Sequence, residues 1–118
     1  MTDSTHLAKK DLTRVNLSNT DLSGADLHES RLCDATLRET NLDGADLTAA
    51  DLSGADLGGA SLRDATAAHT NLEGADLRNT DLTGANMRGA RLAGAKLGKA
   101  QRADATRAGA DLDPADLE

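Results

Sequence analysis

Residues 40–60, TNLDGADLTAADLSGADLGGA, repeat one five-residue unit without interruption. A leucine stands at every fifth position, and a small residue, Thr or Ala, lies two positions before it. Asn or Asp lies between the small residue and the leucine, and the two positions after the leucine are mostly small or polar. A fixed period held over many units is the signature of a repeat architecture. The four leucines of this stretch are Leu42, Leu47, Leu52 and Leu57.

The same frame runs from residue 10 to residue 99 without an insertion. Ala67 and Met87 replace the central leucine within it, and Arg102 and Arg107 occupy the central position near the C-terminus. No stretch has the composition of a linker, and 118 residues leave room for one domain. We therefore interpret residues 1–118 as a single repeat domain, with regular units at about 10–99 and a degenerate coil or cap at 100–118.

A period of five matches neither the 3.6 residues of a helix turn nor the two of a strand. The small residue and the leucine are two positions apart, which places them on the same side of an extended backbone. The Asp or Asn between them then faces outward, and the following polar positions suit a turn. Extended segments joined by corners coil the chain, and leucines meet across layers when a whole number of units completes each coil.

Four units per coil would give a 20-residue repeat. TDLSG at 20–24, TNLDG at 40–44 and TDLTG at 80–84 favour that number, whereas TNLEG at 70–74 does not fit the pattern. Stacked leucines would form a narrow core, each contributing about 1.5–3 kcal/mol on burial. The predicted core leucines are Leu22, Leu27, Leu42, Leu47, Leu52, Leu57, Leu62, Leu72, Leu77 and Leu82.

The A(D/N)Lxx units resemble those of the pentapeptide-repeat proteins over about nine tenths of the chain. This resemblance implies an all-β fold, a right-handed quadrilateral β-helix with four units per coil and about five coils. Residues 100–110, AQRADATRAGA, are rich in alanine and in helix-forming residues, so a short helical or irregular C-terminal cap is expected. A β-helix exposes unpaired backbone groups at its ends, and pairing of two molecules through one end is the alternative to a cap.

The net charge is −7, from 20 acidic and 13 basic residues. This disfavours direct binding to nucleic acid or to an anionic membrane and favours a basic protein partner. The N-terminus has no apolar core of a signal peptide, and no run approaches the roughly 18 apolar residues of a membrane span. We therefore expect a cytoplasmic protein. The single cysteine, Cys33, excludes an internal disulfide and is expected to be an exposed thiol.

No catalytic, cofactor or metal site is predicted. The repeat itself places carboxylates at regular intervals, and nothing in the sequence separates their environments as acid–base catalysis requires. With four units per coil, His28 and His69 would share a face but lie about two layers apart, and His6 is the remaining imidazole. Metal ligands must converge within a few ångströms, so surface histidines are expected. Phosphate-binding loops and nucleophile elbows are absent.

Charge is distributed unevenly along the repeat. Residues 21–56 contain nine acidic residues against two arginines, whereas residues 88–107 contain six basic residues against Asp104. We expect an acidic N-terminal half and a basic band at 88–107, which offer a partner surface or head-to-tail pairing of unlike ends. The candidate acidic partner surface comprises Asp21, Asp26, Glu29, Asp46, Asp51 and Asp56.

The best-known functional branch of the pentapeptide-repeat family consists of acidic rods that resemble B-form DNA. They bind DNA gyrase or topoisomerase IV and protect it from quinolones or topoisomerase poisons. This chain is similar in its regular units and acidic N-terminal half, but it lacks phenylalanine, inserted loops and a uniformly acidic surface. The resemblance implies a non-catalytic protein-binding scaffold, with a type II topoisomerase as the most specific candidate partner. The alternative is a structural protein that stacks end to end and has no topoisomerase role.

Overall fold

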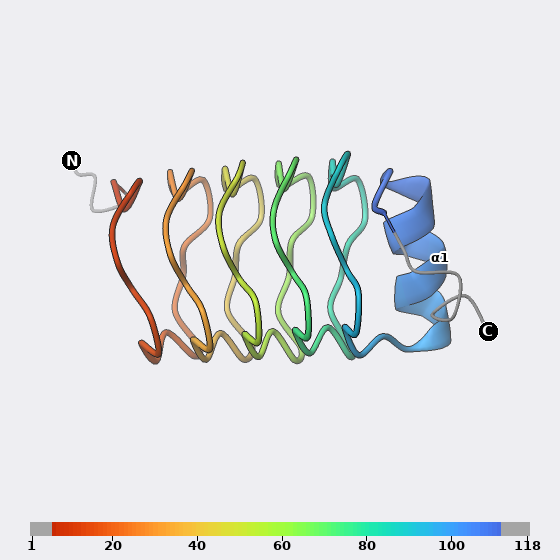
Figure 1. Ribbon diagram of the computed structural model, residues 1–118, viewed down its shortest axis with the longest axis horizontal. Helices are drawn as coiled ribbons and strands as arrows, with labels where there is room; N and C mark the ends of the chain where they lie inside the picture. The colour runs from red at the N-terminus through yellow and green to blue at the C-terminus, as the bar shows by residue number, and fades with distance from the viewer. Residues whose placement is uncertain (1–5, 112–118) are drawn as a thin grey trace.

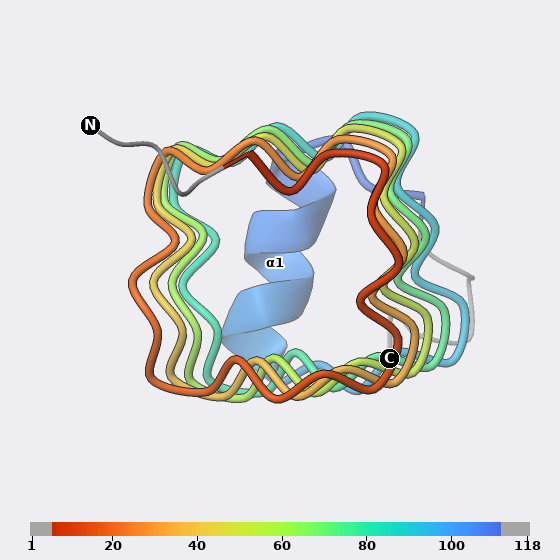
Figure 2. The same ribbon diagram turned by 90° about the vertical axis from the view of Figure 1, so that its left-hand side faces the viewer.

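The structure is a computed structural model that describes residues 6–111. These residues form a four-sided rod that one helix closes at the C-terminal end (Figure 1). The chain measures 44 × 25 × 23 Å. Viewed along its length, the coils superimpose as a stack of squares (Figure 2).

Parallel bridges join each coil to the next, and every isolated bridge pairs a residue with the one 20 positions later. Four five-residue units therefore complete one coil, which confirms the periodicity expected from the sequence. The bridging residues define four walls. Wall 1 contains residues 6, 26, 46, 66 and 86; wall 2 contains 11, 31, 51, 71, 91 and 111; wall 3 contains 16, 36, 56, 76 and 96; wall 4 contains 21, 41, 61 and 81.

Each unit consists of a short extended segment and a tight turn. In the unit at 50–54, Asp51 N–H donates to Ser30 O in the coil before, at 2.9 Å, and Leu52 N–H donates to Asn71 O in the coil after, at 2.7 Å. The turn closes when Ala55 N–H donates to Leu52 O at 3.0 Å. Gly54, the third turn residue, has φ +70°, as a type II turn requires. The wall residue thus faces outward while the leucine faces the core.

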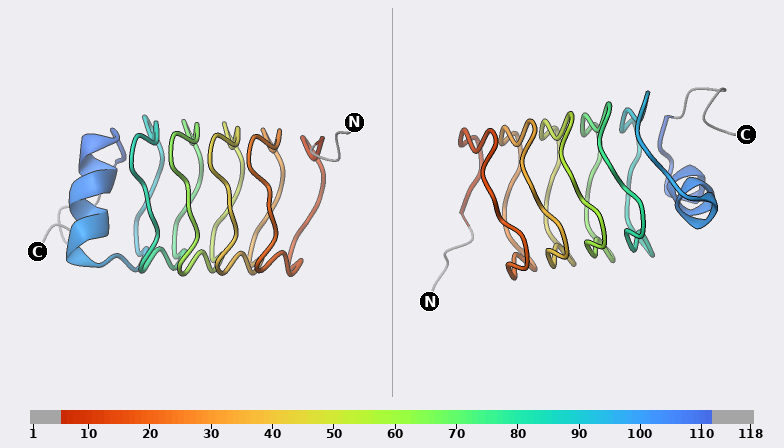
Figure 3. Two further views of the ribbon diagram at one scale, coloured as in Figure 1. Left: turned by 180° about the vertical axis from the view of Figure 1, so that it is seen from behind. Right: turned by 90° about the horizontal axis from the view of Figure 1, so that it is seen from below.

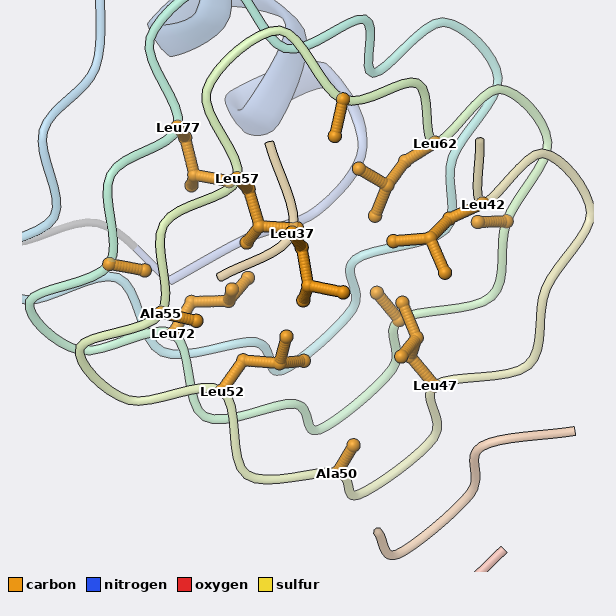
Figure 4. Packing of buried hydrophobic residues seen from close by; sticks show 14 of the residues in the cluster. Leu37, Leu42, Leu47, Ala50, Leu52, Ala55, Leu57, Leu62, Leu72 and Leu77 are labelled. Atoms are coloured by element: carbon orange, nitrogen blue, oxygen red, sulfur yellow. The ribbon is translucent and has the colours of Figure 1, made fainter. Parts of the chain in front are cut away.

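The core is a set of leucine columns parallel to the rod axis. The ten leucines named from the sequence are between 0 and 6% exposed. Figure 4 shows Leu37, Leu57 and Leu77 in one such column. Alanine fills most of the other inward positions. At positions 40, 70 and 80 a threonine replaces it, and the hydroxyl donates to a leucine carbonyl in the preceding coil, as Thr70 Oγ1 does to Leu47 O at 2.8 Å. The inward polar group is thereby satisfied.

The rod ends at helix α1, Lys99–Arg107, which lies across the C-terminal opening (Figures 1 and 3). Ala105 is its buried residue, with no exposed surface, and belongs to the hydrophobic core. After α1 the chain pairs with the last coil before the helix. Met87 N–H donates to Ala108 O at 2.8 Å, and Asp111 N–H donates to Ala90 O at 2.8 Å. The expected cap is therefore helical. Within residues 6–111, no helix is long and apolar enough to cross a membrane.

The N-terminal coil has no such lid among the described residues. Leu7, Leu12, Val15 and Leu17 pack against the core but are only partly buried. Their counterparts one coil later, such as Leu32 and Leu37, are 0–1% exposed. The two ends of the rod therefore differ in how they terminate the same leucine columns.

Candidate protein-binding surface

The six acidic residues predicted as a partner surface lie on all four walls. Asp26 and Asp46 bridge each other on wall 1, and Glu29 occupies the corner after Asp26 with φ +56°. Asp51 lies on wall 2, Asp56 on wall 3 and Asp21 on wall 4. Asp26, Glu29 and Asp46 thus lie together along wall 1. The other three acidic residues are distributed over the remaining walls. We call residues 21–56 the acidic band, because its charges encircle the rod and do not form one flat patch.

Outward aspartates also hold the local backbone. Asp21 Oδ1 accepts hydrogen bonds from Ser23 N–H at 3.0 Å and from Ser23 Oγ at 2.7 Å. Asp51 Oδ1 accepts the same pair from Ser53, at 3.0 and 2.7 Å. Asparagine performs this role in other units, as where Asn41 Oδ1 accepts Asp43 N–H at 2.9 Å. An Asp→Asn exchange therefore removes the charge while retaining the backbone contact.

These hydrogen bonds keep the carboxylates ionised. The bonds from Ser23 lower the pKa of Asp21 below its usual value. Burial acts to raise the pKa of Asp51, but the bonds from Ser53, with a smaller contribution from Arg31, outweigh it and lower that pKa as well. Hydrogen bonds to the charged form favour it. Asp21 and Asp51 therefore keep their negative charge at neutral pH.

Ion pairs neutralise part of the band. Arg38 Nη1 lies 3.2 Å from Asp56 Oδ2 on wall 3, and Lys9 Nζ lies 3.9 Å from Glu29 Oε1. Within residues 6–111, no salt bridge involves Asp21, Asp46 or Asp51. Among the six predicted residues, these three carboxylates are therefore the ones that no salt bridge compensates.

Two hollows among the described residues are each lined in part by paired charges. One of about 270 Å³ lies between α1 and the last coil, where Arg107 Nη1 donates to Asp104 Oδ1 at 2.8 Å. Another of about 150 Å³ lies on wall 3 beside Arg78, whose guanidinium makes two hydrogen bonds to Asp76. Neither gathers a nucleophile with an adjacent base, which is the arrangement that covalent or acid–base catalysis needs.

Two side chains differ from the sequence-based expectations. Cys33 is half-buried and not exposed, because Ser53 and Asp51 of the next coil lie beside it, and burial raises the pKa of its thiol. His28 is partly buried, and its neighbours are aspartates: donor atoms of Asp26, His28 and Asp46 all lie within 4.8 Å of one another. Positions 26, 28 and 46 differ by two and by 20, so the coil length is the signal that brings them together.

The chain belongs to the pentapeptide-repeat family. The model of that family, described as pentapeptide repeats, matches eight copies over residues 4–38, 25–64 and 60–98. No curated protein sequence matches the chain. The solved relatives of this family are right-handed β-helices, which confirms the fold class expected from the sequence.

Rfr23, a pentapeptide-repeat protein from the cyanobacterium Cyanothece 51142, is 47% identical, with a TM-score of 0.74. The match covers 75% of this chain and 60% of Rfr23, so the chain spans less than two thirds of that relative. The pentapeptide-repeat protein alr5209 from Nostoc PCC 7120 is 34% identical over 88% of this chain and 85% of its own, with a TM-score of 0.79.

QnrB1, described as a plasmid-mediated fluoroquinolone resistance protein, shares the fold at 19% identity. The match covers 80% of this chain and 54% of QnrB1, with a TM-score of 0.67. At this identity the likeness concerns the fold alone. The family and these relatives are repeat proteins without an indicated catalytic activity.

Proposed function

We propose that the protein is a non-catalytic scaffold whose acidic band binds a basic surface on a partner protein, in place of DNA. The most specific candidate partner is a type II topoisomerase, DNA gyrase or topoisomerase IV. Fluoroquinolones act on these enzymes, and QnrB1 is described as a resistance protein to that drug class. Because that likeness concerns the fold alone, the choice of topoisomerase comes from the family resemblance, and the charge of the band carries the broader proposal.

The charge density of the acidic band is the observation that supports mimicry most. Nine acidic residues and two arginines fall within residues 21–56, fewer than two coils. At about 4.8 Å per coil this segment spans roughly 9 Å of the axis, or one net negative charge per about 1.3 Å. Duplex DNA carries about one per 1.7 Å. The charges surround the rod as phosphates surround a duplex.

The basic band limits how far this mimicry extends. Residues 88–107 carry six basic residues against one acidic residue, so the potential reverses towards α1. Basic groups of a partner that binds the acidic band would be repelled by the basic residues of this chain beyond about residue 88. The proposal therefore assigns binding to the N-terminal half of the rod.

Gyrase supercoiling, with and without ciprofloxacin, tests the topoisomerase assignment. The wild-type chain should inhibit supercoiling or restore it in the presence of the drug at micromolar concentration. The double variant Asp46→Asn/Asp51→Asn should weaken this effect, because it removes two charges of the band while keeping the bonds to Thr48 and Ser53. The matched control Asp64→Asn/Asp81→Asn removes two charges outside the band and should behave like the wild type. No effect of the wild-type chain would remove topoisomerase as the partner.

A second candidate, pairing of two copies, is favoured by the open N-terminal coil. One coil later, Arg31 N–H donates to Lys10 O at 2.9 Å and Asn41 N–H donates to Thr20 O at 3.0 Å. No described residue accepts a bond from the equivalent N–H groups of Asp11 and Asp21. An edge that no described residue pairs, with leucines that are only partly buried, favours association.

The C-terminal cap leaves only the N-terminal end free for the end-to-end assembly expected from the sequence. Helix α1 closes the other opening, so N-terminal coils can meet only head to head, which stops growth at two copies. In an antiparallel pair, facing residues exchange both backbone bonds, so such an edge is complementary to itself. An end of about 25 × 23 Å offers on the order of 500 Å² per copy, close to the roughly 1,000 Å² in total that a specific interface needs.

Gel filtration with light scattering over a concentration series tests this second candidate. The wild-type chain should approach a dimer mass at high concentration, and Leu12→Lys should remain a monomer because it places a charge on the open end. Thr66→Lys, on the outer side of wall 1, is the control and should dimerise normally. A monomer at all concentrations, or growth beyond a dimer, contradicts the head-to-head arrangement.

A further inference from the structure

We propose that Asp26, His28 and Asp46 on wall 1 form a binding site for a divalent transition-metal cation of the Zn²⁺ class. Donor atoms of the three residues lie within 4.8 Å of one another, and all three side chains are partly buried. Asp26 and His28 belong to one unit, and Asp46 is the bridging partner of Asp26 in the next coil. The inference does not depend on the proposed partner or on pairing of two copies.

The imidazole of His28 lies beside the carboxylate of Asp26. In several units, a Ser or Thr two positions after the wall aspartate donates its hydroxyl to that carboxylate, as Thr48 Oγ1 does to Asp46 Oδ1 at 2.6 Å. His28 occupies this position in its own unit, and its Nδ1 lies 2.5 Å from Asp26 Oδ1. The repeat therefore places a nitrogen ligand where other units place a hydroxyl. Asp46 is likewise held, since Thr48 N–H and Oγ1 both donate to it.

Within the described residues, aspartates bridge directly between coils at two places. These pairs are Asp26 with Asp46 and Asp56 with Asp76. Like charges opposite each other on a sheet repel. On wall 3, Arg38 pairs with Asp56 at 3.2 Å and Arg78 pairs with Asp76 at 2.8 Å, so guanidinium cations compensate both carboxylates.

On wall 1 the residue that takes the place of those arginines is His28. An imidazole differs from a guanidinium because its neutral form offers a lone pair to a metal. His6 lies in the preceding coil, where its backbone bridges that of Asp26. His28 Nδ1 contacts Asp26, whereas no ion pair among the described residues involves Asp46. A bound cation would place one positive charge beside both carboxylates, as Arg38 and Arg78 do on wall 3.

The donor set indicates the class of cation. Imidazole nitrogen suits Zn²⁺, Cu²⁺ and Ni²⁺, whereas Mg²⁺ and Ca²⁺ prefer sites made of oxygen ligands only. Asp26 supplies one oxygen ligand to such a site. Asp46 supplies a second oxygen ligand, and water or His6 can complete a four-coordinate site.

Isothermal titration of the metal-free full chain with ZnCl₂ tests the site. We expect one equivalent of zinc per chain and a higher melting temperature with zinc, because a cation that binds only the folded chain stabilises it. His28→Gln and Asp46→Asn should each weaken zinc binding about tenfold or more. Both variants should retain the wild-type circular-dichroism spectrum, since Asn keeps the bonds from Thr48.

Two matched controls show whether binding is local. His69→Gln removes an imidazole at a corner two coils further along wall 1, and Asp81→Asn removes a wall carboxylate bonded by Thr83. Both should bind zinc as the wild type does. Excess Mg²⁺ should not compete. The proposal is overturned if His28→Gln binds zinc as tightly as the wild type, if either control weakens binding equally, if Mg²⁺ competes on equal terms, or if millimolar zinc gives no heat.

Discussion

The leucine columns are covered differently in the middle of the rod and at its two ends. In the middle, each leucine is covered by the coil before it and the coil after it, so Leu52 and Leu57 are 0–1% exposed. At the N-terminus Leu12 and Leu17 lack one of these covers among the described residues. At the C-terminus α1 supplies the missing cover with Ala105. A repeat thus stabilises its interior automatically, whereas each end needs its own device.

The largest expected effect separates the middle from the open end. Leu52→Lys places a charge between Leu32 and Leu72, where it has no partner and no access to water, and should cost more than about 4 kcal/mol. Leu12→Lys changes the same column at the open end, where the ammonium can reach solvent, and should cost about 1 kcal/mol. Urea unfolding followed by circular dichroism measures both. Equal losses would show that the columns are not sealed in the middle.

Asp51→Lys is the control for a charge on the outer side of the same unit. It should leave the chain folded, at a cost of about 1 kcal/mol for the two bonds from Ser53. If it destabilises the chain as strongly as Leu52→Lys does, the assignment of inner and outer positions is wrong.

The next effect concerns the closed end. Ala105→Glu puts a carboxylate on the buried side of α1 and should displace the cap, at a cost of about 2–3 kcal/mol. Ala103→Glu, on the exposed side of the same helix, should change stability by less than about 0.5 kcal/mol. Hydrogen exchange of the Met87 amide, which donates to Ala108 O, reports whether the cap remains in place. If the Met87 amide still exchanges slowly in Ala105→Glu, the cap tolerates a carboxylate at this position. Ala105 would then not be the residue that seals the rod.

A smaller effect tests the charges that support the middle. A hydrogen bond from Arg78 lowers the pKa of Asp76 from 3.8 to about 2. Because the folded-state pKa is depressed, this stabilisation is present above about pH 4 and is lost as pH falls towards 2. Arg78→Ala should therefore lose less stability than the wild type over that window. An identical acid dependence of the melting temperature would contradict the pairing.

The smallest effect concerns the corners. Ala49 and Gly44 occupy successive exposed corners with φ +59° and +69°. Ala49→Gly should stabilise the chain by up to about 1 kcal/mol, because a side chain in the left-handed region is strained. Gly44→Ala should destabilise it by a similar amount, although an added methyl group would meet no atom within 4 Å. Thermal melts that change in the same direction for both variants would contradict the turn geometry.

The sequence predicted the middle of the rod better than its ends or its surface. The spacing of leucine and small residues is enough to predict inner and outer positions, because extended backbone alternates sides. The wall on which each residue lies follows once four units complete a coil, which is how Asp26, His28 and Asp46 meet. Rotamers and neighbouring coils decide the rest: Arg38 reaches Asp56 from 18 positions away, and Ser53 covers Cys33.

The most direct test of the account is nuclear Overhauser spectroscopy on protein labelled at the leucine methyl groups. Leucines 20 positions apart should show strong methyl contacts along each column, as between Leu37, Leu57 and Leu77 (Figure 4). Contacts between leucines 15 or 25 positions apart, without those at 20, would contradict the four-sided coil on which the core, the acidic band and the wall 1 cluster all depend.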